Sequence, residues 1–489
     1  MSPATAPTRA DLEPLVGGYL GRQRWFAGPP SSAAGASLVA LEALRPGLVW
    51  ALAEVGPATY QLLVGARPED EAVALLGGQE GAVLGSLPSG EIAYDALVDP
   101  ELALAVLDIV TEGRERAERI RPVGAEQSNS SLIFDDRVIL KVFRRLQQGP
   151  NPDVEVTLAL DRVGFNHLAA PLGHWRRDDL DLDLAIAQEF LHGGTEGWSL
   201  ALTSLRDLYA RVGEIQGGPV GVEVAAAAGG DFGAEARRLG EMTARLHLAL
   251  AASMGEEDGR PQDWSADVAH QVATAREALE TARAGAVPRP PDRTAEEAEA
   301  SAPAEGPQAA PPEVESLGSE RVDELIARLG QVSHPGRSVR VHGDYHLGQV
   351  MRTDQGWFVL DFEGEPARPL ADRRRPRSPL KDVAGMLRSL DYATAAALKD
   401  RADGERILSL GLDRAWEERN RASFLQGYLS MPQMEGLLPA PGRDLDTVLR
   451  AMEVEKAAYE LAYELAYRPT WADIPARALD RLLLGGGNP

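Results

Sequence analysis

The sequence predicts an α+β protein in which a sheet-containing N-terminal part precedes a mainly helical C-terminal part. Short apolar runs with strand-like alternation, such as 48–55 and 60–64, are concentrated in the first two hundred residues. Beyond them, apolar residues recur at the three- and four-residue spacing of helices. A Pro-, Ala- and Glu-rich segment, 284–318, interrupts the helical part. We therefore expect a bilobal protein with a small domain at its N-terminus.

Three regions follow from these patterns. Residues 1–89 are expected to form the small N-terminal domain, with a helix at its start and the alternating runs after it. Residues 90–195 begin with a helix-like stretch, Leu102–Val110, and continue as a lobe with a mixed sheet. Residues 196–489 form the helical lobe, in which 284–318 is expected to be a disordered linker. The strongest helical patterns in this lobe are 234–251, 380–392, 413–429, 443–467 and 475–484.

The overall composition excludes several classes of function. The chain has 74 acidic and 50 basic residues among 489, and its net charge of −24 disfavours binding to nucleic acid or to an anionic membrane. It contains no run of 18 apolar residues, and its start lacks the pattern of a signal peptide. Without cysteine there are no disulfides, no thiolate catalysis and no Cys-ligated zinc. We expect a cytoplasmic protein.

The segment Val341–Gln349 gives the clearest chemical signal. In the kinase loop His-Arg-Asp-x-x-x-x-Asn, the aspartate accepts the proton of the acceptor hydroxyl and the asparagine binds Mg²⁺. Asp344 occupies the position of this base, and Gln349 brings the amide oxygen on a longer side chain. Asp361, in Leu-Asp-Phe-Glu, corresponds to the second metal ligand. The alternative is that these aspartates only cap loops around a structural His342. It does not explain why the base, the amide and the second aspartate of the motif occur together.

Local patterns indicate how these residues come together. The apolar runs 338–341 and 357–360 flank a turn-like stretch, 352–356, which predicts a hairpin with Asp344 and Asp361 at one mouth. Three further polar residues are interpreted as structural. We expect His247 to be a packed core histidine and Asp382 the N-cap of a helix. His346 is expected to be a solvated loop residue, with a ligand role as the alternative.

A lysine within an apolar strand points to a phosphate group. Lys141 interrupts the run Val138–Phe143, as does the kinase lysine that pairs with the α- and β-phosphates, although a solvated strand face is the alternative. Glu155, in the first turn of an expected helix, either positions Lys141 or complements the helix dipole. The preceding polar stretch either cradles phosphate or forms a plain turn, with the candidates Ser128, Asn129 and Ser130.

Two further segments are expected to bind substrates. The strand 185–191 runs into His-Gly-Gly, which predicts an interlobe hinge whose backbone at Glu189 and Leu191 hydrogen-bonds adenine. In the tail, aromatic and acidic residues recur at helical spacing, and such a surface suits a disaccharide. Packing of the tyrosines in the core, with solvated glutamates, explains the same pattern. The candidates are Tyr459, Glu460, Tyr463, Glu464 and Trp471.

The chain resembles bacterial maltokinases along nearly its whole length. The resemblance rests on 125–131, 139–145, 342–349, 361–366 and 373–376, and it extends to 22–28 and 459–471 near the termini. It implies the protein-kinase-like fold of aminoglycoside phosphotransferases, with residues 1–89 as a cap domain. It also implies transfer of the ATP γ-phosphate, with Mg²⁺, to the anomeric hydroxyl of maltose. The product would be maltose 1-phosphate for α-glucan (glycogen) synthesis, and association with a trehalose synthase is possible.

The identity of the acceptor is open. We expect His342, Tyr345 and Glu363 to contact the sugar, but maltokinases carry leucine where this chain has Tyr345. Glucosamine or aminoglycoside phosphorylation is therefore the alternative within the same fold. A non-catalytic partner of a trehalose- or glucan-processing enzyme is the alternative from another class. Metal-dependent hydrolysis lacks a third histidine ligand and leaves Lys141 without a role.

Overall fold

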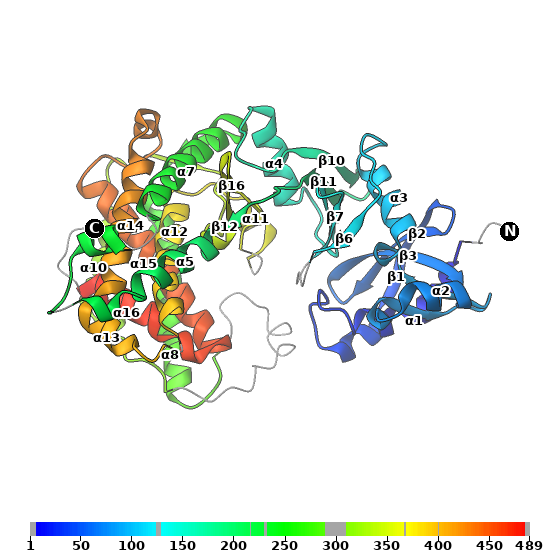
Figure 1. Ribbon diagram of the computed structural model, residues 1–489, viewed down its shortest axis with the longest axis horizontal. Helices are drawn as coiled ribbons and strands as arrows, with labels where there is room; N and C mark the ends of the chain where they lie inside the picture. Colours follow the sequence, from blue (N-terminus) through cyan, green and yellow to red (C-terminus); the bar gives the residue numbers. More distant parts are fainter. Residues whose placement is uncertain are drawn as a thin grey trace. The chain divides into compact units, whose positions relative to one another are not determined.

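The computed structural model describes residues 6–123, 129–215, 217–228, 232–288, 310–365, 368–399 and 401–484, which form two compact units (Figure 1). Unit 1 combines the described residues up to Leu158 with Ala169–His192. Unit 2 combines Ala159–Leu168 with the described residues from Gly193 onward. No described helix is both long enough and apolar enough to cross a membrane. Each unit is presented separately below.

The N-terminal part of unit 1 is a sheet with the strand order β1-β2-β3-β5-β4. Helix α1 (Arg9–Leu20) packs its apolar side, including Leu12 and Val16, into a core with strands of this sheet. Strand β2 is buried along most of its length, as expected for a central strand of Val, Trp, Leu and Ala. The strands are β1 (Ser37–Arg45), β2 (Leu48–Val55), β3 (Ala58–Pro68), β4 (Val83–Ser86) and β5 (Glu91–Asp95), with helices α2 (Glu69–Leu76) and α3 (Pro100–Val110).

A second sheet of unit 1 has the order β10-β11-β8-β7-β6. Its strands are β6 (Ile120–Pro122), β7 (Asn129–Phe134), β8 (Val138–Phe143), β10 (Pro171–Arg177) and β11 (Leu182–Glu189), and helix α4 (Pro152–Arg162) follows β8 in the chain. All of its strand pairs are antiparallel, so the expectation of a mixed sheet is wrong. The physical reason is the short connection at Asp135 and Asp136, both with positive φ, which reverses the chain directly from β7 into β8.

The two sheets of unit 1 are joined by buried polar contacts. Strand β9 (Arg145–Leu146) continues from β8 and pairs with β3. The fully buried Gln61 on β3 donates from its amide to the carbonyl oxygens of Phe143 (2.8 Å) and Leu184 (2.9 Å). Because these bonds lie where water does not reach, they fix the N-terminal sheet to the strand that carries Lys141.

Unit 2 is mainly helical. Helix α14 packs on α7, and α15 packs on α8, α12 and α16. The main helices are α5 (Gly197–Tyr209), α6 (Val222–Ala228), α7 (Phe232–Met254), α8 (Pro261–Arg283), α10 (Glu320–Gly330), α11 (Leu370–Arg373), α12 (Leu380–Leu398), α13 (Gly404–Leu410), α14 (Leu412–Leu429), α15 (Arg443–Tyr467) and α16 (Asp473–Leu484). The expected helix 443–467 is confirmed with the bounds of α15. Of the expected linker, 289–309 lies outside the described residues, and Ser316–Gly318 forms a short 3₁₀ helix.

A small hairpin in unit 2 carries the expected metal ligands. It consists of β15 (Val350–Thr353) and β16 (Gly356–Val359), and β15 also pairs with β12 (Thr195–Glu196). The turn of the hairpin is therefore placed as predicted, but residues 338–341 do not form the first strand of the hairpin. Arg337–Val339 is β14 and pairs with β13 (Glu256–Asp258) instead. The catalytic-loop residues lie between β14 and β15, so the loop connects two different small sheets.

Candidate active site

One face of α12 holds the loop that carries Asp344. The Asp382 carboxylate accepts hydrogen bonds from the backbone N–H groups of His342 (2.8 Å) and Gly343 (2.9 Å). Three residues later along the helix, Gly385 leaves room for the carbonyl oxygen of Tyr345, which would lie 2.6 Å from a Cβ at this position. Residues at this spacing share a helix face, so α12 is a template for the loop. Asp382 is the third residue of α12 and not its N-cap, which corrects the prediction.

The buried His247 forms a hydrogen bond with the Asp382 carboxylate. Its ring nitrogens are bonded to Asp382 (Nε2 to Oδ2, 3.0 Å) and to the Tyr428 hydroxyl (Nδ1 to Oη, 2.8 Å). Burial would raise the pKa of Asp382, but the bond from His247, the nearby His342 and the Gly343 N–H lower it below the ordinary value. Asp382 therefore holds the loop as a charged carboxylate, and the expectation of a packed His247 is confirmed by its zero exposure.

His342 and Tyr345 lie in the interior, where a sugar does not reach them. The His342 ring packs against that of Phe362 at an angle of 45°, with centroids 5.2 Å apart, and its Nε2 is 2.9 Å from the carbonyl oxygen of Leu360. The Tyr345 hydroxyl is 2.8 Å from Thr243 Oγ1. Both residues are 2% exposed. We therefore correct the expectation that they contact the acceptor: His342 packs the loop against the segment around Asp361, and Tyr345 packs it against α7.

Asp344 projects from this loop as a partly exposed carboxylate between the side chains of Lys456 and His346. Its Oδ1 lies 3.6 Å from Lys456 Nζ, its Oδ2 lies 3.8 Å from His346 Nε2, and its side chain is 24% exposed. Burial would raise the pKa of Asp344, but the bond with His346 and the charges of Lys456, His346 and His342 lower it well below the ordinary value. The group is thus ionised at neutral pH and able to accept a proton.

Lys456 on α15 is a component that the sequence analysis missed. Its Nζ is 3.3 Å from Glu365 Oε1 and lies 4.9 Å from the centre of the Tyr459 ring. Burial lowers the pKa of Lys456, but Glu365, Asp344 and Glu460 raise it well above the ordinary value, so the side chain stays charged. Its position three residues before Tyr459 places both on one helix face, which is a signal that the sequence contained.

Gln349 and Asp361 meet at the open end of the β15–β16 hairpin. The Leu360 N–H donates to the Gln349 carbonyl oxygen (2.9 Å), and the Gln349 Nε2 lies 3.5 Å from Asp361 Oδ2. Asp361 is exposed and has a φ of 59°, a left-handed conformation that is unfavourable for a residue with a side chain. In this contact the Gln349 amide nitrogen faces the carboxylate, and rotation of the amide would turn its oxygen toward Asp361. Amide and carboxylate oxygens are ligands that Mg²⁺ prefers. The residues present therefore fit a divalent cation.

In unit 1, Lys141 has an acidic partner that the sequence analysis did not name. Its Nζ is 3.1 Å from Asp153 Oδ2, near the start of α4, and its side chain is 15% exposed. Glu155 lies one half-turn further along α4, and its proposed role remains a prediction. A lysine held by a buried carboxylate at a strand centre fits a phosphate clamp better than a solvated strand face.

The other nucleotide candidates lie around the same sheet. Asn129 begins β7 and is buried, and Ser130 Oγ accepts a hydrogen bond from Arg144 Nε (2.8 Å). Ser128 lies outside the described residues. At the end of β11, the Glu189 N–H donates to the Ala170 carbonyl oxygen (2.8 Å), so this group is not the one that would bind adenine. These roles therefore remain predictions.

The candidates in the tail are of two kinds, acidic residues that are paired with arginines and aromatic residues. Glu460 pairs with Arg388 (2.8 Å), and the buried Glu464 pairs with Arg468 (2.6 Å). Their expected role as ligands of sugar hydroxyls remains a prediction. The rings of Tyr459 and Tyr463 stack, with centroids 6.3 Å apart, and the Tyr467 ring follows. Trp471, in the turn after α15, lies under Lys399 and Arg468. The aromatic series thus starts beside Lys456 and runs outward along the helix.

This arrangement corresponds to a known enzyme family. Residues 119–404, more than half of the chain, match the phosphotransferase enzyme family. The chain belongs to this family. Residues 19–99 match the maltokinase N-terminal cap domain, which confirms the predicted resemblance and the cap. The protein is therefore a phosphotransferase, and Asp344 and Asp361 lie within the matched region.

Several relatives of this phosphotransferase are named glucosamine kinases. Those from Streptacidiphilus jiangxiensis and Mycolicibacterium smegmatis (strain ATCC 700084 / mc(2)155) are 29% and 28% identical over 371 residues, which span 74% of this chain and 73% and 79% of theirs. A solved glucosamine kinase in complex with glucosamine, ADP and inorganic phosphate aligns with a TM-score of 0.62 at 22% identity. That alignment covers 98% of this chain and 100% of the other, and it confirms the kinase-like fold.

Proposed function

We propose that this phosphotransferase transfers the γ-phosphate of ATP to the anomeric hydroxyl of maltose, giving maltose 1-phosphate for α-glucan synthesis. The observation that supports the proposal is the position of Asp344, whose carboxylate lies 3.6 Å from Lys456 Nζ and 3.8 Å from His346 Nε2. The ionised carboxylate of Asp344 accepts the proton of the sugar hydroxyl, while the oxygen of that hydroxyl forms a bond to the γ-phosphorus. The bond between that phosphorus and the bridging oxygen breaks, and ADP leaves.

The remaining residues bind and orient the reactants. Gln349 and Asp361 would hold Mg²⁺, which neutralises charge on the phosphate oxygens. Lys141, fixed by Asp153, pairs with the phosphates of ATP. Asn129, Ser130, Glu155, Glu189 and Leu191 complete the proposed nucleotide site.

The cap domain and the aromatic series support maltose as the acceptor. The cap is the one named for maltokinases. Tyr459, Tyr463 and Trp471 extend beyond the position of Asp344, as a second glucose ring would require, because sugar faces stack on aromatic rings. Glu363, which is partly exposed two residues after Asp361, completes the acceptor site.

Glucosamine is the second candidate, because the two curated relatives carry that name. The deciding experiment measures ADP release with maltose, glucosamine and kanamycin side by side, with Asp344→Asn as the blank for each sugar. We expect the highest kcat/KM for maltose. A higher kcat/KM for glucosamine or kanamycin would assign the acceptor to that class, and ADP release equal to the blank with every sugar would reject the proposed function.

A further inference from the structure

Glu365 is a buried acid near the base to which the proposed reaction assigns no role. It lies four residues after Asp361, and its side chain is 8% exposed. Its two carboxylate oxygens are divided between two cations. Oε1 accepts a hydrogen bond from Lys456 Nζ (3.3 Å), and Oε2 accepts one from Arg368 Nε (3.0 Å). Glu365 therefore binds the same lysine that lies beside Asp344.

The two acidic neighbours of Lys456 stand in different relations to it. Its Nζ is within hydrogen-bonding distance of Glu365, but the 3.6 Å to Asp344 Oδ1 is too long for a hydrogen bond. The ammonium group thus acts on Asp344 through its charge, while its hydrogen bond goes to Glu365. A hydrogen bond from lysine directly to Asp344 would favour the ionised carboxylate further and make it a weaker base.

A second pair of charges holds Glu365 from its other side. Arg368 Nη2 lies 3.6 Å from Glu455 Oε1, and the same oxygen lies 2.7 Å from Lys381 Nζ. Glu455 is a buried residue of α15, and Lys381 belongs to α12, directly before the Asp382 that holds the catalytic loop. Acids and bases alternate along this series, so each buried charge has an opposite charge beside it. Glu365 is thereby tied to both helices.

Asp344 is faced by three titratable side chains, two of them from its own loop. His346 is fixed within the loop, because its Nδ1 accepts the Gly348 N–H (3.0 Å), and His342 is buried against Phe362. Lys456 instead reaches Asp344 from α15. Because a lysine side chain is long and loses much rotamer freedom when it is held in one place, it needs further contacts to stay there. Glu365 supplies such a contact.

We propose that Glu365 is a positioning residue, which takes the hydrogen bond of Lys456 and so keeps this lysine from closing onto Asp344. Without the Glu365 carboxylate, Lys456 turns to Asp344, the other acid within 4 Å of its ammonium group among the described residues. The base then becomes too weak to accept the proton of the acceptor hydroxyl efficiently. The inference rests on the proposed role of Asp344 as the base, and it holds for whichever sugar is the acceptor.

Steady-state kinetics of Glu365→Gln in two backgrounds test this role. Glutamine keeps the size of the side chain but carries no charge and turns an NH₂ group toward one of the two cations. In the otherwise wild-type chain, we expect kcat to fall by about tenfold while the KM for ATP stays within about twofold. In the Lys456→Met background, the same substitution should change kcat by less than about twofold, because the lysine through which Glu365 acts is absent.

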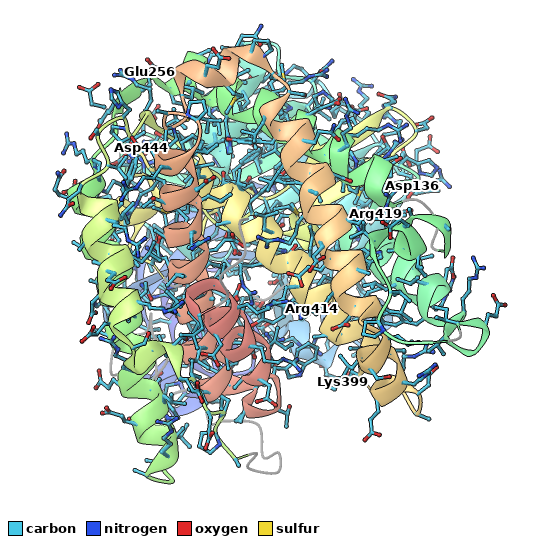
Figure 2. The ribbon with its side chains drawn as sticks, turned by 90° about the vertical axis from the view of Figure 1, so that its left-hand side faces the viewer. Asp136, Glu256, Lys399, Arg414, Arg419 and Asp444 are labelled. Carbon is cyan, nitrogen blue, oxygen red and sulfur yellow. The ribbon has the colours of Figure 1, made fainter. Side chains whose placement is uncertain are left out.

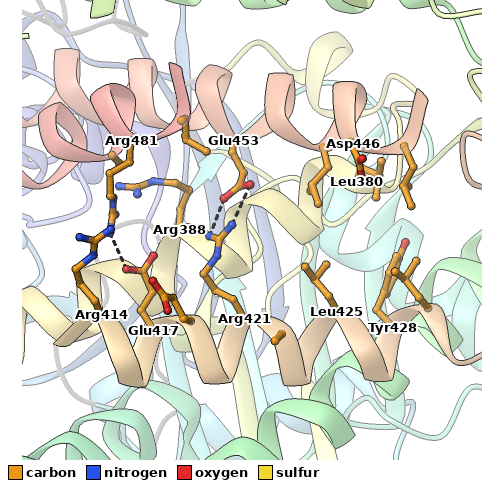
Figure 3. Close-up of a pocket in the computed structure, with 17 residues that line it drawn as sticks. Leu380, Arg388, Arg414, Glu417, Arg421, Leu425, Tyr428, Asp446, Glu453 and Arg481 are labelled. Carbon is orange, nitrogen blue, oxygen red and sulfur yellow. Dashed lines mark hydrogen bonds and ion pairs between the residues drawn. The ribbon is translucent and has the colours of Figure 1, made fainter. Parts of the chain in front are cut away.

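Glu453→Gln is the matched control, on a face of α15 directed to another helix. Helices α14 and α15 run in opposite directions, with Arg414 near the start of α14 and Asp444 near the start of α15 (Figure 2). Glu453 is buried and accepts two hydrogen bonds from Arg421 of α14, 2.7 and 3.1 Å (Figure 3). The control should therefore lose stability in urea unfolding, while its kcat stays within about threefold of the wild type.

Two results would overturn the inference: a wild-type kcat in Glu365→Gln, or an equal loss of kcat in both backgrounds, which marks a purely structural residue. Wild-type turnover in Asp344→Asn, measured in parallel, would instead reject the proposed base, so the two failures are distinguishable. If Glu365→Gln does not fold, Arg368→Gln takes its place, since the Arg368 side chain is 16% exposed. It frees the other oxygen of Glu365 and should lower kcat by about threefold, again only in chains that retain Lys456.

Discussion

Replacing Asp382 with asparagine tests whether α12 positions the catalytic base. The Asp382 carboxylate accepts three hydrogen bonds, from His342 N, Gly343 N and His247 Nε2, at 2.8, 2.9 and 3.0 Å. Asparagine keeps the size of the side chain but replaces one acceptor oxygen by an NH₂ group, which faces a donor. The change therefore leaves at least one buried donor without an acceptor and removes the charge that His247 and His342 face.

The expected magnitude follows from these contacts. Breaking a buried, charge-assisted network by removing one partner costs about 3–5 kcal/mol in the free energy of unfolding. A displacement of the loop on the order of 1 Å moves Asp344 away from the acceptor hydroxyl and lowers kcat by roughly 100-fold. We expect both effects in the Asp382→Asn variant, with little change in the KM for ATP, since this residue lies behind the loop.

Urea unfolding and steady-state kinetics measure the two effects. Asp391→Asn is the matched control, because Asp391 is also a buried acid of α12 but pairs with Arg388 and Arg481 instead of the loop. The control should lose stability while kcat changes by less than about threefold, as expected for a site outside the reaction. A wild-type kcat in Asp382→Asn, or an equal loss of kcat in both variants, would refute the positioning role.

Three other changes address the rest of the site. Lys456 lowers the pKa of Asp344, and the base acts when ionised, so Lys456→Met should shift the acid limb of the kcat/KM profile to higher pH; an unshifted limb would contradict this. Gly385→Ala places a Cβ 2.6 Å from the Tyr345 carbonyl oxygen, so urea unfolding should show a loss of about 1–3 kcal/mol, whereas Gly436→Ala, in open space, should show little. Lys141→Met should weaken ATP by roughly 2 kcal/mol in calorimetry and leave the KM for sugar unchanged; unaltered ATP affinity would exclude the clamp.

Local patterns in the sequence predicted much of this molecule. The helix 443–467 was predicted with its bounds because a long periodic stretch without Pro or Gly leaves little alternative. Asp344, Gln349 and Asp361 were chosen as candidates from a sequence motif, and the hairpin brings the last two together. These are properties of one continuous segment.

Contacts between distant segments were not predictable in this way. Lys456 approaches Asp344 from a helix more than a hundred residues further along the chain, and only the fold places it there. The pairing of Glu460 with Arg388, on another helix, was likewise not predictable from the pattern of the tail. His342 and Tyr345 belong to the motif, yet they point into the core, because one loop cannot expose all of its side chains.

Turnover of the Asp344→Asn variant tests the central claim most directly. Asparagine has nearly the same shape as aspartate but accepts no proton, so kcat should fall by about 10²–10⁴-fold. ATP affinity, measured by calorimetry on the same preparation, should stay within about threefold of the wild type, because Asp344 is assigned to the acceptor hydroxyl. Turnover close to that of the wild type would show that another group takes the proton and would contradict the account.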